Sequence, residues 1–291
     1  MTHSVILLTG AAGQLGFELA RFLPEHGELV AVDRAALDLA DADAIAATVR
    51  RVRPQIIVNA AGYTAVDRAE SEPVLADAIN ARAPEILAKE AKRLDALLIH
   101  YSTDYVFDGS SAKPYSEDDR PNPVNVYGAS KLAGERAITA AGCAHLILRT
   151  SWVYGLHGQN FLLTMKRLAA TREELRVVAD QFGVPNWSRV LAEATARLVG
   201  RGTAALADKS GIYHLSGRGR ASWFDFARAI FDDADRPRVV PITTAEYPTP
   251  ARRPASAVLA SAKLEEVFGM ALPDWRQTLA ACKAAASIHA R

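Results

Sequence analysis

The chain has 291 residues, of which 49% are hydrophobic, and its 34 basic and 33 acidic side chains leave a formal net charge of +1. A chain of this length buries a large core and usually divides into two lobes, while its interspersed charges exclude the basic surface that binds nucleic acid. Two cysteines cannot build a disulfide framework, and the seven histidines never fall at metal-ligand spacing, so we expect a cytoplasmic protein with reduced thiols and no zinc.

Short apolar runs alternate with longer helical patterns through the first half of the chain. In chain order, the expected strands and helices are Val5–Thr9, Gln14–Leu23, Leu29–Asp33, Asp43–Arg53, Ile56–Asn59, Val74–Arg93, Ala96–His100, Val126–Ala141 and His145–Arg149. The first run is too short for a signal peptide or a membrane span. Continuous apolar strands separated by helices are typical of a parallel sheet covered on both faces. We therefore predict a doubly wound α/β (Rossmann) domain in residues 1–150, with ligands at the carboxyl ends of its strands.

The regular alternation of strand and helix patterns ends after about Thr150. Proline, glycine, tryptophan and tyrosine become frequent, as in Gln181–Asn186 and Tyr247–Pro254. This change predicts a smaller C-terminal α/β lobe, mainly residues 151–291, that covers the ligand edge of the sheet. Some of its segments are expected to cross back to the first lobe.

A glycine turn connects the first strand to its helix. Gly10 permits a tight turn, Gly13 lets the backbone approach a pyrophosphate, and Gly16 lets the helix pack close to the sheet. The helix N-terminus, with Gln14 and Leu15, offers N–H groups and a positive dipole end to phosphate. Glycines in a tight turn can be purely structural, but this placement favours a dinucleotide cofactor.

The cofactor's adenosine end is expected beside the second strand. Asp33 ends that strand, where an acid usually holds the ribose 2′-hydroxyl, whereas Arg34 can face a 2′-phosphate. An aspartate there can equally cap the next turn, so the choice between NADH and NADPH stays open. Asp38 and Leu39 are also expected to contact the adenosine end of the cofactor. A second turn of small residues follows the third strand and consists of Asn59, Ala60, Ala61 and Gly62, although an ordinary Asn-Gly loop would look the same.

Tyr127 and Lys131 lie one helical turn apart on the same face of the helix expected at Val126–Ala141. A tyrosine with a pKa of about 10 is a poor acid–base catalyst at neutral pH, and a nearby cation is expected to lower that pKa. Lys131 can also hold the nicotinamide ribose, and the Thr103 hydroxyl can stabilise a substrate oxygen that gains charge. A Tyr/Lys pair alone is common on exposed helices; together with the glycine turn, the three residues predict a short-chain dehydrogenase site.

The chain resembles the dTDP-4-dehydrorhamnose reductase family, whose members belong to the extended short-chain dehydrogenases, over essentially its whole length. The segments that carry the resemblance are Ile56–Ala61, Thr64–Asp67, Ala69–Pro73, His100–Phe107, Asn125–Gly128, Lys131–Glu135, Arg149–Tyr154, Asp180–Gly183 and Tyr247–Pro254. The resemblance implies that NADPH or NADH reduces the C4 keto group of dTDP-4-dehydro-L-rhamnose, with the proton coming from Tyr127.

The resemblance also implies substrate contacts. Trp152 would pack against the sugar, although an aromatic closing the lobe interface is the alternative. Asp104 and Tyr105 would reach the sugar, and Arg252 and Arg253 would bind the diphosphate, for which a guanidinium fork is suited. On residue pattern alone, a solvated surface pair of arginines is the more common outcome.

One position departs from the family. Some members are thought to dimerise through a metal held by acidic side chains, and Glu18 and Glu193 fall where two of those acids are expected. Arg189 stands where a third would be, and a cation opposes a divalent metal such as magnesium. We therefore predict no metal site, and a homodimer stays open.

Two other functions compete with this one. A related sugar-nucleotide reductase or epimerase would use the same Tyr/Lys pair. A non-catalytic regulatory subunit of the same fold is a different class, and the intact set of Thr103, Tyr127 and Lys131 argues against it. The nucleotide base, the cofactor preference and the oligomeric state do not follow from the sequence.

Overall fold

A computed structural model describes residues 4–232 and 237–289. Its centre is a six-stranded parallel sheet with the strand order β10-β5-β4-β3-β1-β2. The strands are β1 (Val5–Thr9), β2 (Glu28–Val32), β3 (Ile56–Asn59), β4 (Leu97–Thr103), β5 (His145–Thr150) and β10 (Gly211–His214). The predicted doubly wound sheet is therefore confirmed. The strand order reverses at β1, between β2 and β3, and this switch point is where such sheets bind ligands.

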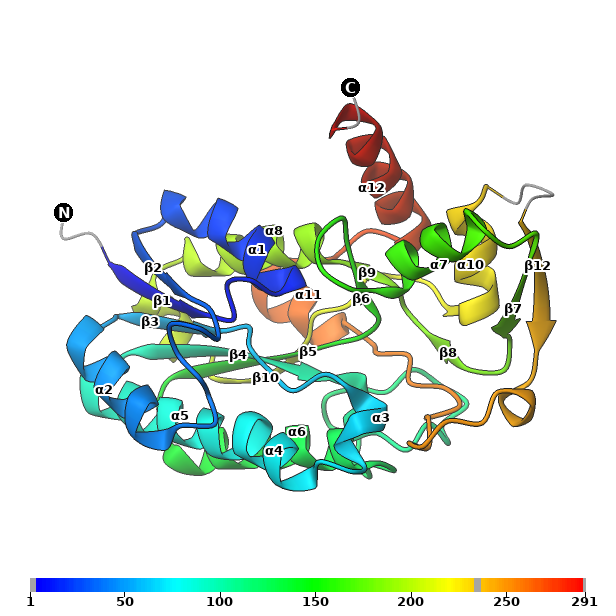
Figure 1. Cartoon of the computed structure of the whole chain (residues 1–291). Coiled ribbons are helices and arrows are strands. Elements are labelled where there is room, and N and C mark those ends of the chain that lie inside the picture. Colours follow the sequence, from blue (N-terminus) through cyan, green and yellow to red (C-terminus); the bar gives the residue numbers. More distant parts are fainter. Residues whose placement is uncertain (1–3, 233–236, 290–291) are drawn as a thin grey trace.

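Helices cover both faces of the sheet (Figure 1). One face carries α1 (Gln14–Phe22), α8 (Ser188–Val199), α9 (Thr203–Ala207) and α11 (Ala262–Phe268); the other carries α2 (Ala42–Val52), α5 (Ala83–Leu94) and α6 (Val126–Ala141). The central strands read as continuous apolar runs because both of their faces are buried; β3 and β4 are buried along their whole length. The second half of the chain contributes to this domain: α8 packs against α1 in one helical layer, and β10 pairs with β5 at the edge of the sheet.

The helix expected at Val74–Arg93 is interrupted. It consists of α4 (Pro73–Asp77), a π-helical turn at Ala78–Arg82 and α5, and a short helix α3 (Val66–Ala69) precedes it. The π-helical turn places the buried Asn80 side chain between Tyr63 and Ser130 of α6. Such single-turn distortions are frequent at functional sites, and this one connects the loop after β3 to α6.

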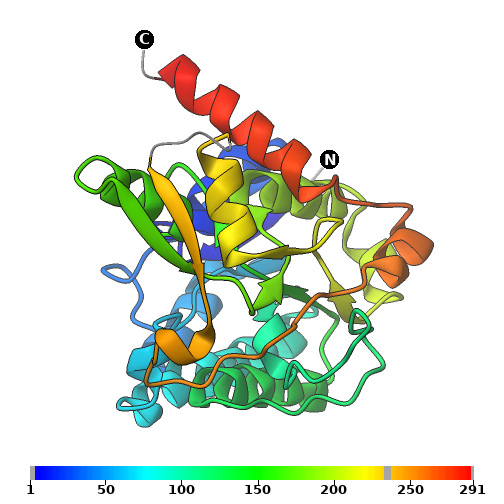
Figure 2. The same cartoon turned by 90° about the vertical axis from the view of Figure 1, so that its right-hand side faces the viewer.

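The second lobe has its own small core beside the carboxyl edge of the sheet (Figure 2). Its strand pairs are β7 (Glu174–Val178) with β12 (Arg238–Ile242), β8 (Phe182–Gly183) with β11 (Ala221–Ser222), and β6 (Val153–Tyr154) with β9 (Asn186–Trp187). Its helices are α7 (Phe161–Ala169), α10 (Trp223–Ile230) and α12 (Trp275–His289). Phe226 and the fully buried Trp275 meet edge-on in this core. In the described part of the chain, no helix is long and apolar enough to cross a membrane.

Candidate active site

The glycine turn after β1 has room for glycine only. Gly10 has a φ of +74°, and a Cβ there would lie 2.7 Å from the Ala61 amide nitrogen. A Cβ on Gly16 would lie 2.0 Å from the Gly10 carbonyl oxygen. No described side chain caps α1, and the buried Gln14 Oε1 has no partner among the described residues. The turn thus presents free N–H groups, which fit the phosphates of a dinucleotide, while the Gln14 oxygen is an acceptor that a ligand hydroxyl could satisfy.

Asp33 caps the turn that follows β2. Its Oδ1 accepts hydrogen bonds from the Ala35 and Ala36 amides at 3.0 and 3.1 Å. The turn-capping alternative is therefore present in the structure, but Asp33 is exposed, so a ribose hydroxyl can still reach its carboxylate. The Arg34 side chain is 77% exposed and lies 3.9 Å from Asp38, so it is free to meet a 2′-phosphate.

Three catalytic candidates meet at the carboxyl edge of β4. Thr103 is the last residue of that strand, and Tyr127 and Lys131 lie in the first turns of α6, which Asn125 caps by accepting from the Gly128 amide. A Cβ on Gly128 would lie 2.2 Å from the Tyr105 carbonyl oxygen, so glycine lets α6 begin directly against the end of β4. The sequence therefore brings the predicted Thr, Tyr and Lys together.

The Tyr127 pKa is raised, not lowered as the sequence pattern suggests. Burial is the main cause, and hydrogen bonding with Thr103 opposes it. Lys131 does not counter the effect because its Nζ points at β4, donating to the Tyr101 carbonyl at 2.6 Å and lying 3.2 Å from His100 Nε2. Burial lowers the Lys131 pKa to about 8. Tyr127 is consequently a neutral phenol over the physiological range, the form from which a proton can be given.

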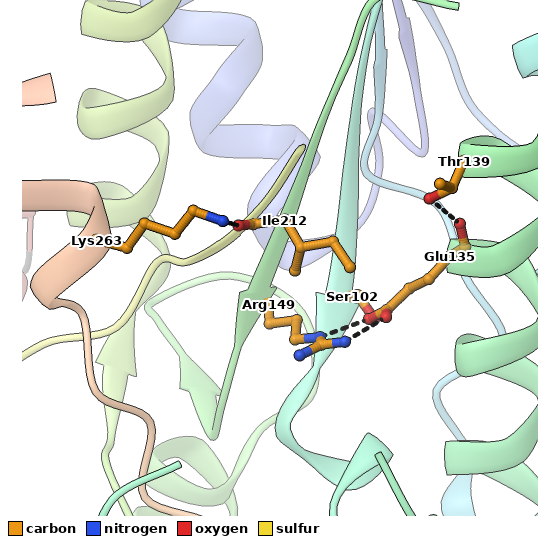
Figure 3. A network of polar contacts seen from close by, with 6 residues as sticks. All are labelled: Ser102, Glu135, Thr139, Arg149, Ile212 and Lys263. Carbon is orange, nitrogen blue, oxygen red and sulfur yellow. Dashed lines mark hydrogen bonds and ion pairs between the residues drawn. The ribbon is translucent and has the colours of Figure 1, made fainter. Parts of the chain in front are cut away.

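A buried ion pair fastens the catalytic helix to the sheet (Figure 3). Arg149 of β5 donates from Nε and Nη2 to the two Glu135 oxygens at 2.9 and 2.6 Å, and Ser102 of β4 donates to the same carboxylate at 2.5 Å. All three side chains are buried. Because Glu135 lies one turn beyond Lys131 on α6, the pair limits sliding of the helix over the strands that carry Thr103.

Asp104 and Tyr105 follow Thr103 in a short 3₁₀ turn, Asp104–Val106. Asp104 is buried, Thr103 donates to its Oδ1 at 3.1 Å, and its Oδ2 has no partner among the described residues. Burial raises the Asp104 pKa to about 7. An unsatisfied buried carboxyl beside Tyr127 is suited to a polar ligand, which agrees with the expected sugar contact.

The two arginines expected at the diphosphate are placed differently. Arg253 donates to Asp67 at 2.7 Å, and its guanidinium lies 5.9 Å from the centre of the Tyr105 ring. Arg252 is exposed, and its carbonyl accepts from Asn125 at 2.8 Å. Of the two, Arg252 is thus the one exposed to solvent, while Arg253 joins its segment to the first turn of α3.

Trp152 has a left-handed backbone with a φ of +43°. Its ring stacks on Trp223 of α10 with the centroids 3.5 Å apart, and a Cβ on Gly183 would lie 2.6 Å from it. Such backbone strain persists where the surroundings hold it and often marks a ligand site. Both expectations for Trp152 stay open, since the ring closes the lobe yet remains partly exposed.

The departure at Arg189 has a structural counterpart. Arg189 Nε lies 3.2 Å from Glu18, which is buried and also lies 3.7 Å from Arg21, while Glu193 is exposed. No group of three His, Cys, Asp or Glu side chains within residues 4–232 and 237–289 is placed to hold a metal.

Several site residues escaped the sequence analysis. They are Asn80, His100, Asp67 as the partner of Arg253, and Trp223. His100 carries a signal, because it is a polar residue within the fully buried run of β4. Asn80, Asp67 and Trp223 carry none, because their partners are far away in the sequence.

The fold and this arrangement of a glycine turn with a Thr/Tyr/Lys set define an extended short-chain dehydrogenase/reductase. The profile of a family described as RmlD substrate binding domain matches residues 4–288. The dTDP-4-dehydrorhamnose reductase of Burkholderia thailandensis is 48% identical over 289 residues, covering 95% of this chain and 97% of the relative; that of Escherichia coli K12 is 46% identical, covering 93% and 94%. The chain belongs to the dTDP-4-dehydrorhamnose reductase family, as the resemblance indicates.

Solved structures agree with this assignment. A dTDP-4-dehydrorhamnose reductase from Bacillus anthracis in complex with NADP is 37% identical, with a TM-score of 0.91 and coverage of 98% of this chain and 99% of that one. The Bordetella bronchiseptica enzyme WbmH in complex with NAD+ is 19% identical, with a TM-score of 0.78 and 97% of each chain covered, and shares the fold.

Proposed function

We propose that the chain reduces the C4 keto group of dTDP-4-dehydro-L-rhamnose to give dTDP-L-rhamnose. The observation that carries the proposal is that Tyr127, hydrogen-bonded with Thr103 and one turn from Lys131, lies at the same carboxyl edge of the sheet as the glycine turn, in a chain 48% identical to a reductase of that name. NADPH or NADH supplies the hydride when bound.

The reacting proton comes from Tyr127. As C4 gains the hydride, the carbonyl oxygen gains negative charge and takes the proton from the Tyr127 hydroxyl, leaving a phenolate that solvent reprotonates. Thr103 donates to the same substrate oxygen, and Lys131 stabilises the phenolate and holds the nicotinamide ribose. The raised pKa of Tyr127 suits an acid that must stay protonated until the carbonyl oxygen becomes basic.

The cofactor would lie along the edge formed by β2, β1 and β3. Its diphosphate would contact the turn from Gly10 to Gly16, including Gln14 and Leu15. Its adenosine would contact Asp33, Arg34, Asp38 and Leu39, and the loop Asn59, Ala60, Ala61 and Gly62 would line its middle.

The substrate would lie between that edge and the second lobe, mainly residues 151–291. Asp104, Tyr105 and Trp152 would contact the sugar. Arg252 would bind the diphosphate directly, and Arg253 would act through its contacts with Asp67 and Tyr105.

An absorbance assay at the nicotinamide band tests this function. The purified chain is mixed with the dTDP-4-keto-6-deoxyhexose and each cofactor in turn, and the product's configuration is determined by NMR. Substrate-dependent oxidation of the cofactor with dTDP-L-rhamnose as product is expected. A product of another configuration would favour a related reductase or epimerase, and a chain that binds the cofactor without turnover would favour the regulatory subunit.

A further inference from the structure

A continuous chain of buried hydrogen bonds runs from β1 to the catalytic lysine. Thr9 donates to Asn59 Oδ1 at 2.6 Å, Asn59 Nδ2 lies 3.0 Å from His100 Nδ1, and His100 Nε2 lies 3.2 Å from Lys131 Nζ. All four side chains are buried, and those of Asn59 and His100 completely. The site chemistry described above uses Lys131 but gives His100 no part.

Asn59 determines which atoms donate and which accept along this series of hydrogen bonds. The Ala61 backbone N–H lies 3.2 Å from Asn59 Oδ1, and a backbone N–H can only donate, so the atom facing it must be the amide oxygen. The amide nitrogen of Asn59 then faces His100 and donates to Nδ1. His100 Nδ1 is therefore an acceptor and carries no proton.

The His100 ring is neutral, because its complete burial lowers its pKa well below the ordinary value. A neutral imidazole has one proton, and with Nδ1 bare that proton lies on Nε2. Two other buried histidines differ in carrying a proton on Nδ1: His145 Nδ1 faces the Cys143 carbonyl at 2.8 Å, and His214 Nδ1 faces the Ala260 carbonyl at 3.0 Å. Carbonyls only accept, so both rings must donate from Nδ1.

The Nε2–H of His100 consequently points at Lys131 Nζ, which must offer a lone pair to complete the hydrogen bond. An uncharged amine can accept from His100 while donating to the Tyr101 carbonyl. An ammonium ion has no lone pair, so its N–H groups would face the Nε2–H of His100 without a hydrogen bond. The charged group that opposes His100 is Glu135, one turn along α6, which favours the ammonium. Glu135 is itself neutralised by Arg149 of β5 (Figure 3). Tyr127 and Asp104 lie beside Thr103 at the end of β4.

We propose that His100 is a positioning residue that donates Nε2–H to Lys131, holds its nitrogen in place and favours its uncharged form. The tautomer of His100 rests on the hydrogen bonds alone, and its effect on turnover rests on the proposed function. Lys131 is then a group whose charge changes within the working range, and the amine takes a proton from solvent and becomes an ammonium when it turns from His100 toward the cofactor ribose.

The tautomer is measured directly by long-range ¹H–¹⁵N NMR of the full chain labelled at histidine. His100→Gln identifies the His100 signals, and His145 and His214 serve as internal references that carry a proton on Nδ1. Wild-type His100 should show a bare Nδ1 and a protonated Nε2 between pH 6 and 9. A protonated Nδ1 at His100 would overturn the proposal whether or not the chain turns over the sugar nucleotide.

Reversing the donor and acceptor roles along these hydrogen bonds tests the effect on Lys131. In Asn59→Asp both side-chain oxygens accept, so His100 should donate from Nδ1 and accept from the Lys131 ammonium. In the variant, the ¹⁵N signals of His100 should show a protonated Nδ1 and a bare Nε2. The alkaline limb of the pH profile of kcat/KM should shift to higher pH by about half to one unit, the equivalent of one hydrogen bond. A reversed tautomer with an unmoved or lowered limb would contradict the link to Lys131.

Rescue separates positioning from packing. His100→Gln can accept from Asn59 and donate to Lys131, so it should keep kcat/KM within about threefold, while His100→Leu should lose about tenfold or more. His145→Gln, another buried histidine on the sheet, is the matched control and should leave the pH profile unchanged. Equal losses in the Gln and Leu variants at equal Tm would show that His100 only fills space.

Discussion

Arg253 donates from Nη2 to Asp67 at 2.7 Å, which joins the proline-rich segment Tyr247–Pro254 to the first turn of α3. The Ala251 amide also donates to Asp67, at 3.2 Å. A guanidinium used in this way cannot offer its full fork to a diphosphate, whereas the exposed Arg252 can. The two adjacent arginines therefore have different roles.

Substitution of each arginine should separate those roles. Arg252→Ala should raise KM for the sugar nucleotide by about one to two decades, the equivalent of a charge-assisted hydrogen bond, and leave Tm unchanged. Arg253→Ala should raise KM and also lower Tm, because the segment loses its link to Asp67. Arg238→Ala, which breaks an exposed ion pair with Glu174, is the control and should change neither. Loss of NADPH affinity in Arg252→Ala would instead place this arginine in the cofactor site.

Tyr127→Phe should leave NADPH binding nearly intact while kcat falls by about two to four decades, because only the proton donor is removed. Steady-state kinetics and cofactor titration by fluorescence measure the two effects. A variant that keeps more than about a tenth of the wild-type rate would mean that another group, with Asp104 the nearest acid, delivers the proton.

Both NADH and NADPH should serve as donors, with kcat/KM values within about two decades of each other. The exposed Asp33 can accept a hydrogen bond from a free ribose hydroxyl, and the exposed Arg34 makes only a 3.9 Å contact with Asp38 among the described residues. Arg34→Ala should lower the preference for NADPH by about tenfold. An unchanged ratio of the two kcat/KM values would show that Arg34 does not reach the 2′-phosphate.

The parts of the site that the sequence predicts are those set by local pattern. The strands are apolar runs because both faces of the sheet are covered, and the glycine turn is recognisable because only glycine fits beside Ala61. Tyr127 and Lys131, the proposed catalytic pair, share α6, so spacing alone places them on one face. The stack of Trp152 on Trp223 and the pair of Arg253 with Asp67 join segments far apart in the chain, and no local pattern records them.

The sequence also cannot predict how burial changes the pKa of a side chain. A Tyr/Lys spacing predicts a lowered tyrosine pKa, but the sign depends on where Lys131 Nζ points and how deeply Tyr127 is buried. For Asp33 the sequence allows both turn capping and a ribose contact, and the path of the chain after β2 shows that its carboxylate caps the turn.

Asp104→Asn should stabilise the protein at pH 8 and have little effect at pH 4. The folded-state pKa is raised to about 7, so between the unfolded value and pH 7 the folded state binds the extra proton and stability falls as pH rises. The amide removes that penalty, which is on the order of a few kcal/mol at pH 8. Thermal unfolding at the two pH values measures it. An equal change in Tm at both would mean that the carboxyl does not titrate in this range.

The last prediction concerns Glu18 and Arg189. Glu18 is buried, and its nearest cations are Arg189 at 3.2 Å and Arg21 at 3.7 Å, so its charge is already balanced within one chain. A divalent metal would have to displace Arg189 and leave a guanidinium beside it. Any homodimer should therefore keep its sedimentation coefficient when a chelator is added, and Arg189→Ala should lower stability by about 3 kcal/mol because a buried carboxylate loses its main partner. Arg197→Ala, at an exposed position of the same helix, is the control. Dissociation of a dimer on chelation alone would show that a metal bridges the subunits despite Arg189.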